Sequence, residues 1–181
     1  LIHLEHTAGA VYVLRNPFDV VISFSDHFKI SHDDAIEAIA APSHRVNTTK
    51  QGVFQILAGW SNHYRTWFGV DNFNPLLMRY EDMIHNPIKT FGRFNKFLGL
   101  PKNPERLKRA IKNSSFSEVS RQETMVGFSE RSRPDQKFFR SGKVGGYKSI
   151  LSEAQIAKII NAHDELLFEK GYITKSGKPK F

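Results

Sequence analysis

Two short apolar runs without alternation predict strands of a buried sheet. Residues 10–14 (AVYVL) and 75–80 (PLLMRY) are such runs, and this pattern is typical of parallel strands that are covered on both faces. Asn16 and Pro17 directly follow the first run, and this pair favours an N-cap and a first helical residue. The sequence therefore predicts a strand, a very short turn and a helix that runs to about Phe28.

Helical spacing of apolar residues recurs further along the chain. Asn86 and Pro87 repeat the start signal, and an apolar stripe follows that stops at Gly99, so we predict a helix between these points. Ser152 predicts the cap of a last helix that runs through Phe168. Further helices are predicted over residues 33–41, 51–67 and 104–112, together with a short helix capped by Ser117.

Three segments have little periodicity and are predicted to be irregular. Residues 43–49 are polar and are predicted to form a loop, and residues 127–147 contain several Gly and Pro residues. A loop of that length is usually functional. The polar tail from residue 174 to 181 is predicted to be frayed. No linker divides the chain, so we expect one α/β domain over residues 1–181 with a parallel sheet.

The composition limits the possible partners. The formal net charge is +8, which suits nucleic acid, an anionic membrane surface or a small polyanionic ligand. Residues 121–148 hold seven basic and three acidic residues, which also fits an ordinary solvated surface. Cysteine is absent, so a disulfide or thiolate metal site is excluded and a cytoplasmic, reducing compartment is expected. No apolar run is long enough to span a membrane, and no membrane partner is expected.

Two polar residues follow the predicted strands at the edge where α/β proteins bind ligands. Arg15 and Tyr80 lie at the carboxyl ends of the two strands, so we expect them to face one crevice. Arg15 can bind a phosphate through two N–H groups, and the next helix begins there with its positive dipole end. The hydroxyl of Ser23 could reach the same anion. An Arg15 that only pairs with Asp19 or Glu81 is an equally good interpretation from spacing alone.

Four segments resemble the sulfotransferases that use 3'-phosphoadenosine 5'-phosphosulfate. VYVLRNPFDVVISFSDHF resembles the segment that binds the 3'-phosphate in that family, and RYEDMIHNP and NSSFSEV resemble two segments that border the adenosine. KFFRSGKVGGYK resembles the loop near the C-terminus that closes over the nucleotide. Their order and spacing agree with the family across nearly the whole chain.

The resemblance implies a three-layer fold related to P-loop NTPases, present here without its first strand and loop. It implies transfer of a sulfuryl group to a hydroxyl or amine of a small acceptor, with adenosine 3',5'-bisphosphate as the product and no metal. Ser141 replaces a Lys of many relatives, so one phosphate contact is lost or is replaced by Lys143. The residues implied in nucleotide binding are Arg15, Ser23, Arg140, Ser141 and Gly142 at the 3'-phosphate and Tyr80, Ser114, Phe116, Phe138 and Phe139 around the adenosine.

The sequence also departs from the family. The loop that cradles the 5'-phosphosulfate does not occur in this chain, and it and the catalytic base are expected upstream of Leu1. His3 and His6 do not match the usual context of that base, so surface or packing roles are favoured and no catalytic residue is assigned. The dimer motif of many animal members is not reproduced after Lys148, which leaves the oligomeric state open.

Two other functions compete with the enzyme. A binding module would hold the bisphosphate nucleotide without catalysis, and this chain alone is expected to be inactive. A nucleic-acid binder would use the basic residues between 121 and 148, but the chain lacks a repeated pattern of basic and aromatic residues, so no nucleic-acid partner is expected. The acceptor cannot be identified from the residues.

Overall fold

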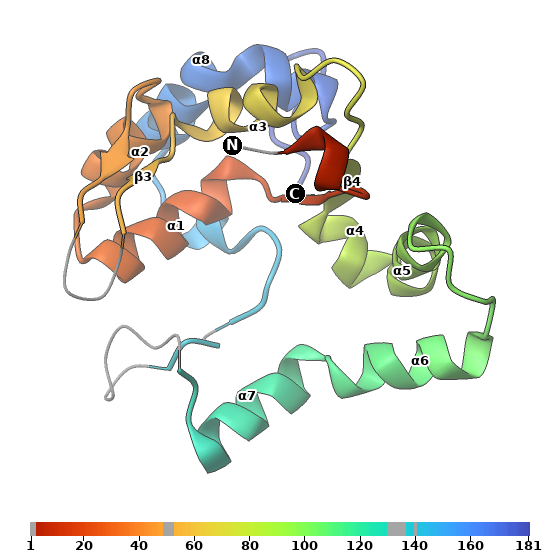
Figure 1. Ribbon diagram of the computed structural model, residues 1–181. Coiled ribbons are helices and arrows are strands. Elements are labelled where there is room, and N and C mark those ends of the chain that lie inside the picture. Colours follow the sequence, from red (N-terminus) through yellow and green to blue (C-terminus); the bar gives the residue numbers. More distant parts are fainter. Residues whose placement is uncertain (1–2, 49–52, 130–136, 140) are drawn as a thin grey trace. The chain divides into compact units, whose positions relative to one another are not determined.

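The computed structural model describes residues 3–48, 53–129, 137–139 and 141–181. The chain divides into two compact units (Figure 1). The first unit comprises residues 1–80 together with Gly145–Phe181, and the second is Glu81–Val144. Each unit is described separately below.

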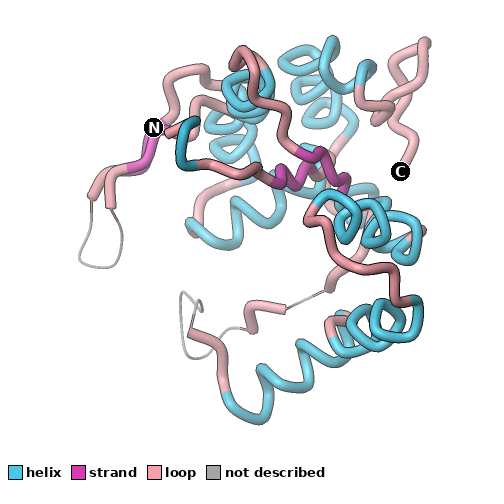
Figure 2. The backbone as a smooth tube through the Cα atoms, turned by 45° about the vertical axis from the view of Figure 1, so that its right-hand side comes forward, coloured by secondary structure: helices cyan, strands magenta, loops and turns pink. Residues whose placement is uncertain are grey.

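A parallel pair of strands forms the sheet of the first unit. Strand β1 (Val11–Leu14) pairs with strand β4 (Leu76–Arg79), and the register runs from Val11 opposite Leu76 to Leu14 opposite Arg79. Figure 2 shows these two strands side by side in magenta. Both strands were predicted from their apolar runs, and their parallel direction places Arg15 and Tyr80 at the same edge.

The helix that follows β1 begins as its sequence predicts. Helix α1 spans Pro17–Phe28, and the Asn16 side chain accepts a hydrogen bond from the Asp19 backbone N–H at 2.8 Å. Pro17 fills the first helical position, where a missing N–H costs nothing. The helix ends at Lys29, whose left-handed φ of 57° stops further helical hydrogen bonding.

The first unit contains further helices. They are α2 (His32–Ala40), α3 (Trp60–Phe68), α8 (Glu153–Glu169) and the 3-10 helices η1 (Leu4–His6) and η2 (Gly146–Ser149). Of these, α2, α8 and η2 contact α1. Capping boxes fix two of the starts, one between Ser31 and Asp34 and one between Ser152 and Gln155. Within the part of the chain that the structure describes, no helix is both long and apolar enough to cross a bilayer.

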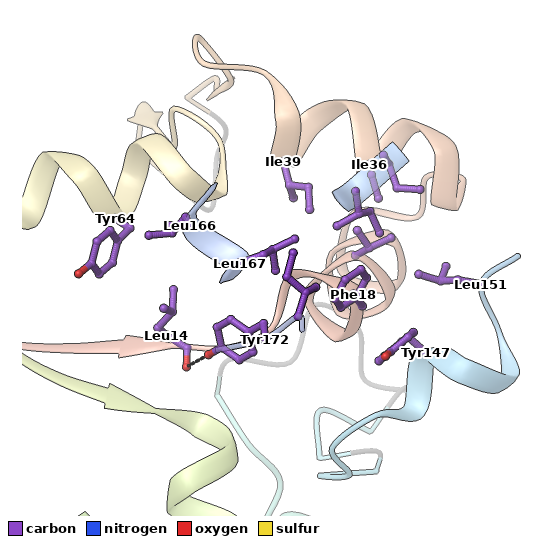
Figure 3. Close-up of a cluster of buried hydrophobic side chains, with 14 residues drawn as sticks. Leu14, Phe18, Ile36, Ile39, Tyr64, Tyr147, Leu151, Leu166, Leu167 and Tyr172 are labelled. Carbon is purple, nitrogen blue, oxygen red and sulfur yellow. Dashed lines mark hydrogen bonds between the residues drawn. The ribbon is translucent and has the colours of Figure 1, made fainter. Parts of the chain in front are cut away.

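The hydrophobic core lies where α1, α2 and α8 meet the end of β1 (Figure 3). Phe18 stacks on Tyr147 with ring centroids 4.8 Å apart. The Tyr172 hydroxyl donates to the Leu14 carbonyl at 3.3 Å, so the one polar end of this buried ring has a partner. The core consists of Leu14, Phe18, Val21, Ala35, Ile36, Ile39, Tyr64, Tyr147, Leu151, Ile159, Leu166, Leu167, Tyr172 and Ile173.

The predicted helix over residues 51–67 and the predicted loop over residues 43–49 are wrong in part. Strands β2 (Arg45–Val46) and β3 (Gln55–Ile56) pair as an antiparallel hairpin, and the helix starts only at Trp60. Ala58 and Gly59 have φ of 54° and 71°, which no right-handed helix allows. A Cβ on Gly59 would lie 2.7 Å from the Ile39 carbonyl oxygen. The close approach of these two backbone segments explains why the residues before Trp60 are not helical, although their apolar spacing is that of a helix.

The tail is ordered rather than frayed, which corrects another prediction. The Lys180 N–H donates to the Tyr172 carbonyl at 2.9 Å, and the Thr174 N–H donates to the Lys178 carbonyl at 2.8 Å. The Tyr147 hydroxyl donates to the carbonyl oxygen of Phe181 at 2.6 Å. These hydrogen bonds hold a short polar segment that its composition alone does not explain.

The second unit consists of helices in series. They are α4, which begins at the boundary (Tyr80–His85), α5 (Pro87–Phe97), α6 (Pro104–Asn113) and α7 (Phe116–Val126). Helix α5 confirms the prediction from Asn86 and Pro87, whereas α4 was not predicted. The cap of α7 is Ser115, two residues before the predicted cap, Ser117. In the described part of this unit, no large hydrophobic side chain is fully buried.

Gly59 and Gly92 provide a matched test of backbone constraint. We expect Gly59→Ala to lower the free energy of unfolding by about 2 to 4 kcal/mol, because it adds a backbone clash to a left-handed conformation. Gly92 lies in α5 with no atom within 4 Å of an added Cβ, so Gly92→Ala should raise stability by about 0.5 to 1 kcal/mol. Urea denaturation measures both, and equal effects would contradict this account.

A buried histidine predicts how stability depends on pH. His163 is 4% exposed, and its Nδ1 lies 2.8 Å from the Ser61 Oγ. Burial, helped by the positive charge of Arg65, lowers the pKa of His163 from 6.5 to about 4. Below pH 6.5 the His163 ring is therefore protonated in the unfolded chain, whereas in the folded chain it is protonated only below about pH 4.

His163 should therefore stabilise the fold fully above pH 6.5 and lose up to about 3 kcal/mol as the pH falls to about 4. Urea denaturation at a series of pH values measures this loss. The His163→Gln variant has no titrating ring at this position and should show a smaller decrease over the same interval. The same pH dependence in both proteins would show that His163 does not contribute.

Candidate functional site

The junction of β1 and α1 places an arginine beside the start of a helix. Only Arg15 and Asn16 separate the two elements, so the backbone turns from strand to helix within two residues. The first turn of α1 supplies the positive end of the helix dipole, while Pro17 has no N–H and the Asp19 N–H already donates to the Asn16 side chain. This geometry favours an anion at the carboxyl edge of the sheet.

Arg15 and Tyr80 meet at this edge, as the two strand ends predicted. The Arg15 guanidinium carbon lies 4.4 Å from the centroid of the Tyr80 ring. This cation–π contact orients the guanidinium plane, and it leaves 28% of the Arg15 side chain exposed. Tyr80 is half-buried, so both groups are held by the fold and still reach solvent.

The alternative role of Arg15, an ion pair with Asp19, is also present in the structure. Arg15 Nη2 lies 3.5 Å from Asp19 Oδ2, which is longer than the 2.7 to 2.9 Å typical of a charge-assisted hydrogen bond. The two interpretations are therefore compatible, because a carboxylate can orient Arg15 without a short contact. Ser23 lies exposed on α1, eight residues beyond Arg15.

Asp19 is the buried polar centre of the first unit. It is 4% exposed, and it accepts hydrogen bonds from the Asn16 side-chain amide at 2.9 Å, from the Gly145 N–H at 2.9 Å and from the Tyr147 N–H at 3.1 Å. Burial, and then the charge of Asp19, raise the pKa of Tyr147 to about 12. One carboxylate thus connects the junction of β1 and α1 to the segment that starts at Gly145.

A tryptophan that the sequence analysis did not select also holds Arg15. Trp60 Nε1 donates to the Arg15 carbonyl oxygen at 2.9 Å. Arg15 and Trp60 are 45 residues apart, and no local pattern connects them. The position of Gly59 directly before Trp60 was the only available signal, since a glycine inside a predicted helix indicates a break.

In the second unit, a buried glutamate holds the two predicted phenylalanines. Glu123 is 2% exposed, and its carboxylate accepts from the Phe138 N–H at 2.6 Å and from the Phe139 N–H at 3.0 Å. Phe128 packs against both rings, with centroids 4.8 and 5.0 Å away. Helix α7 therefore fixes this part of the segment that was predicted to be irregular.

Of the other predicted site residues of this unit, two contact each other and two are exposed. Phe116 and Gly142 are in contact, because a Cβ on Gly142 would lie 2.2 Å from Phe116 Cδ2 and Gly142 has a φ of 60°. Ser114 is exposed, and its hydroxyl donates to the Ala110 carbonyl at 2.8 Å. Ser141 is exposed and accepts from the Lys143 N–H at 3.2 Å, and Arg140 lies outside the described residues.

Several histidines that were not assigned to the site have a hydrogen-bond partner or lie at the surface. The Nδ1 of His63 lies 2.7 Å from the hydroxyl of Tyr12, and burial lowers the pKa of His63. His3, Glu5 and His6 are exposed, and one ligand atom of each lies within 4.8 Å of the others. Among the described residues this is the one such group that could hold a metal ion, and it consists of two residues of η1 and the residue before η1.

Comparison with known proteins connects this geometry to one family. Residues 4–171 match the family model described as the sulfotransferase domain. Sulfotransferase 2A6 of Rattus norvegicus is 28% identical over 170 residues, which cover 90% of this chain and 56% of the relative. The chain therefore spans little more than half the length of the curated relatives that it matches.

Solved structures agree in fold. The crystal structure of mouse sulfotransferase SULT7A1 complexed with PAP has a TM-score of 0.63 and 19% identity, covering 96% of this chain and 62% of that chain. The structure of retinol dehydratase in complex with androsterone and inactive cofactor PAP has a TM-score of 0.66 and 21% identity, covering 88% of this chain and 47% of that chain. The expected α/β fold, related to P-loop proteins, is confirmed.

Removal of the Asp19 carboxylate should loosen the segment that starts at Gly145. We expect Asp19→Ala to lower the free energy of unfolding by about 3 kcal/mol, because several buried donors lose their acceptor. Amide hydrogen exchange should become faster at Gly145 and Tyr147. Asp33→Ala is the control, because exposed Asp33 binds Lys158 and Gln155 at the surface and its removal should change stability much less. Unchanged exchange at Gly145 in Asp19→Ala would contradict this role.

Proposed function

The chain belongs to the sulfotransferase family, and from this premise we propose that it binds the nucleotide of an enzyme that uses 3'-phosphoadenosine 5'-phosphosulfate. The enzyme would transfer the sulfuryl group to a hydroxyl or amine of a small acceptor. The acceptor atom forms the new bond to sulfur while the bond between sulfur and the 5'-phosphate oxygen breaks. The acceptor loses its proton, and adenosine 3',5'-bisphosphate leaves.

The observation that carries this proposal is the position of Arg15. A 3'-phosphate needs donors that converge from a rigid support. Arg15 lies between the carboxyl end of β1 and the N-terminus of α1, with its guanidinium 4.4 Å from the Tyr80 ring centroid and its carbonyl held by Trp60. We assign Arg15 and Ser23 to the 3'-phosphate and Tyr80 to the adenine.

The second unit supplies aromatic groups that suit an adenosine. Phe116 touches Gly142, and Phe138 and Phe139 are held on the Glu123 carboxylate. Aromatic faces stack on nucleobases with useful free energy, on the order of 1 to 3 kcal/mol per base. We assign Phe116, Phe138, Phe139 and Ser114 to the adenosine. We assign Arg140, Ser141 and the backbone around Gly142 to the 3'-phosphate.

The residues of this chain would bind and orient the nucleotide, while the transfer of the sulfuryl group needs further catalytic groups. A loop that cradles the 5'-phosphosulfate does not occur in the sequence, and the sequence context of His3 and His6 does not match that of the family's base. We therefore assign no catalytic base. We also propose a cytoplasmic location, which the absence of cysteine supports, and an apolar small acceptor, by analogy with the androsterone bound in one similar structure.

Binding of adenosine 3',5'-bisphosphate should depend on Arg15. The bisphosphate should raise the melting temperature of the chain, and 5'-AMP, which lacks the 3'-phosphate, should raise it much less. The Arg15→Ala variant should lose most of this difference, because a hydrogen-bonded contact to a charged group is worth about 1.5 to 3 kcal/mol. Differential scanning fluorimetry measures the shifts.

Arg65→Ala is the matched control for Arg15→Ala. Arg65 also lies in the first unit and pairs with a carboxylate, Glu165, at the surface. Its removal should leave the shift caused by the bisphosphate unchanged. If both nucleotides stabilise the chain equally, or if Arg15→Ala and Arg65→Ala behave alike, the assignment of the 3'-phosphate site is wrong.

A further inference from the structure

The positive charge of the chain is concentrated in one segment that the nucleotide site does not use. Residues 86–113 hold eight basic residues and one acidic residue, a formal charge of +7 in a chain whose total is +8. The segment covers α5, α6 and their connection. We call its basic residues the basic face: Lys89, Arg93, Lys96, Lys102, Arg106, Lys108, Arg109 and Lys112.

The basic face is open to solvent and has almost no internal compensation. All eight side chains are exposed. Lys108 contacts Glu105 at 3.0 Å, and among the described residues no other side chain of the basic face lies within ion-pair distance of a carboxylate. Lys89, Arg93 and Lys96 follow one another at helical spacing, so like charges lie side by side on α5. An external anionic surface would reduce the repulsion between these like charges.

Exposed apolar side chains border the same face. Ile88 at the start of α5 is 51% exposed, and Phe97 at its end is 39% exposed. Leu98 and Leu100, which follow α5, are 49% and 47% exposed. Large apolar groups next to uncompensated positive charge are the composition of helices that lie in the headgroup region of a bilayer.

We propose that the basic face and its apolar border bind the surface of an anionic lipid bilayer. Lysine and arginine are attracted to the negative headgroups, and Ile88, Phe97, Leu98 and Leu100 gain by leaving water for the acyl boundary. A nucleic acid would satisfy the charges but would not bury these apolar groups. This proposal departs from the expectation of no membrane partner, which followed from the lack of a run long enough to span a bilayer, because the contact proposed here is peripheral.

Sedimentation with lipid vesicles tests the proposal. The complete chain should bind vesicles of phosphatidylcholine mixed with phosphatidylserine and not vesicles of phosphatidylcholine alone, and added salt should weaken binding. The triple variant Lys89→Gln, Arg93→Gln, Lys96→Gln should bind on the order of 100-fold more weakly. The control Lys175→Gln, Lys178→Gln, Lys180→Gln removes three exposed charges from the C-terminal segment of the first unit and should change binding much less.

A second variant separates lipid binding from general polyanion binding. Leu98→Ser combined with Leu100→Ser keeps every charge and should weaken binding to the anionic vesicles. Binding of the same protein to a labelled single-stranded DNA serves as the comparison and should not change. The proposal is overturned if the chain does not bind anionic vesicles or if the two triple variants bind alike. It is also overturned if the chain binds DNA more tightly than vesicles and the leucine substitutions change neither affinity. Unchanged melting temperatures would confirm that each variant is folded.

Discussion

Much of the first unit depends on how one buried carboxylate is satisfied. Burying an ionised group is costly unless hydrogen bonds and a positive charge compensate it, and Asp19 obtains both from Asn16, Gly145, Tyr147 and Arg15. Gly145 is the first residue after the second unit, and Tyr80, which contacts Arg15, is the last residue before it. The residues at both boundaries, Tyr80 and Gly145, are therefore held by contacts with the junction of β1 and α1.

The elements that the sequence predicted correctly are those whose signals are local. Asn16 and Pro17 define the start of α1 through one side-chain hydrogen bond and one fixed φ, and both are readable from adjacent residues. The predicted helix over residues 51–67 failed for the opposite reason. Its apolar spacing was helical, but Gly59 packs against the carbonyl oxygen of Ile39, and a contact 20 residues away along the chain is not part of any local pattern.

The candidate site shows the same division. The proximity of Arg15 and Tyr80 could be predicted because parallel strands end at the same edge of a sheet. The support of Arg15 by Trp60 and of Gly145 by Asp19 could not be predicted, since these contacts span 45 and 126 residues. The family resemblance implies which residues would touch a nucleotide, whereas the side chains that hold those residues are seen only in the structure. Asp19 was considered as a partner for Arg15, but its hydrogen bonds to the distant segment were not foreseen.

Most of the positive charge of this chain lies on residues other than those that we assign to the nucleotide. A small anion needs only a few convergent donors on rigid elements, and the site that we propose at Arg15 requires no large local excess of charge. Part of the positive charge of the segment 121–148 is paired, because Arg121 Nη2 lies 2.6 Å from Glu118 Oε1. Most of the excess instead lies on α5 and α6, on residues that no nucleotide assignment uses. A charge that is not needed for the small ligand and is not neutralised within its own unit requires a separate physical reason, and an extended anionic surface is the partner to which such a face is complementary.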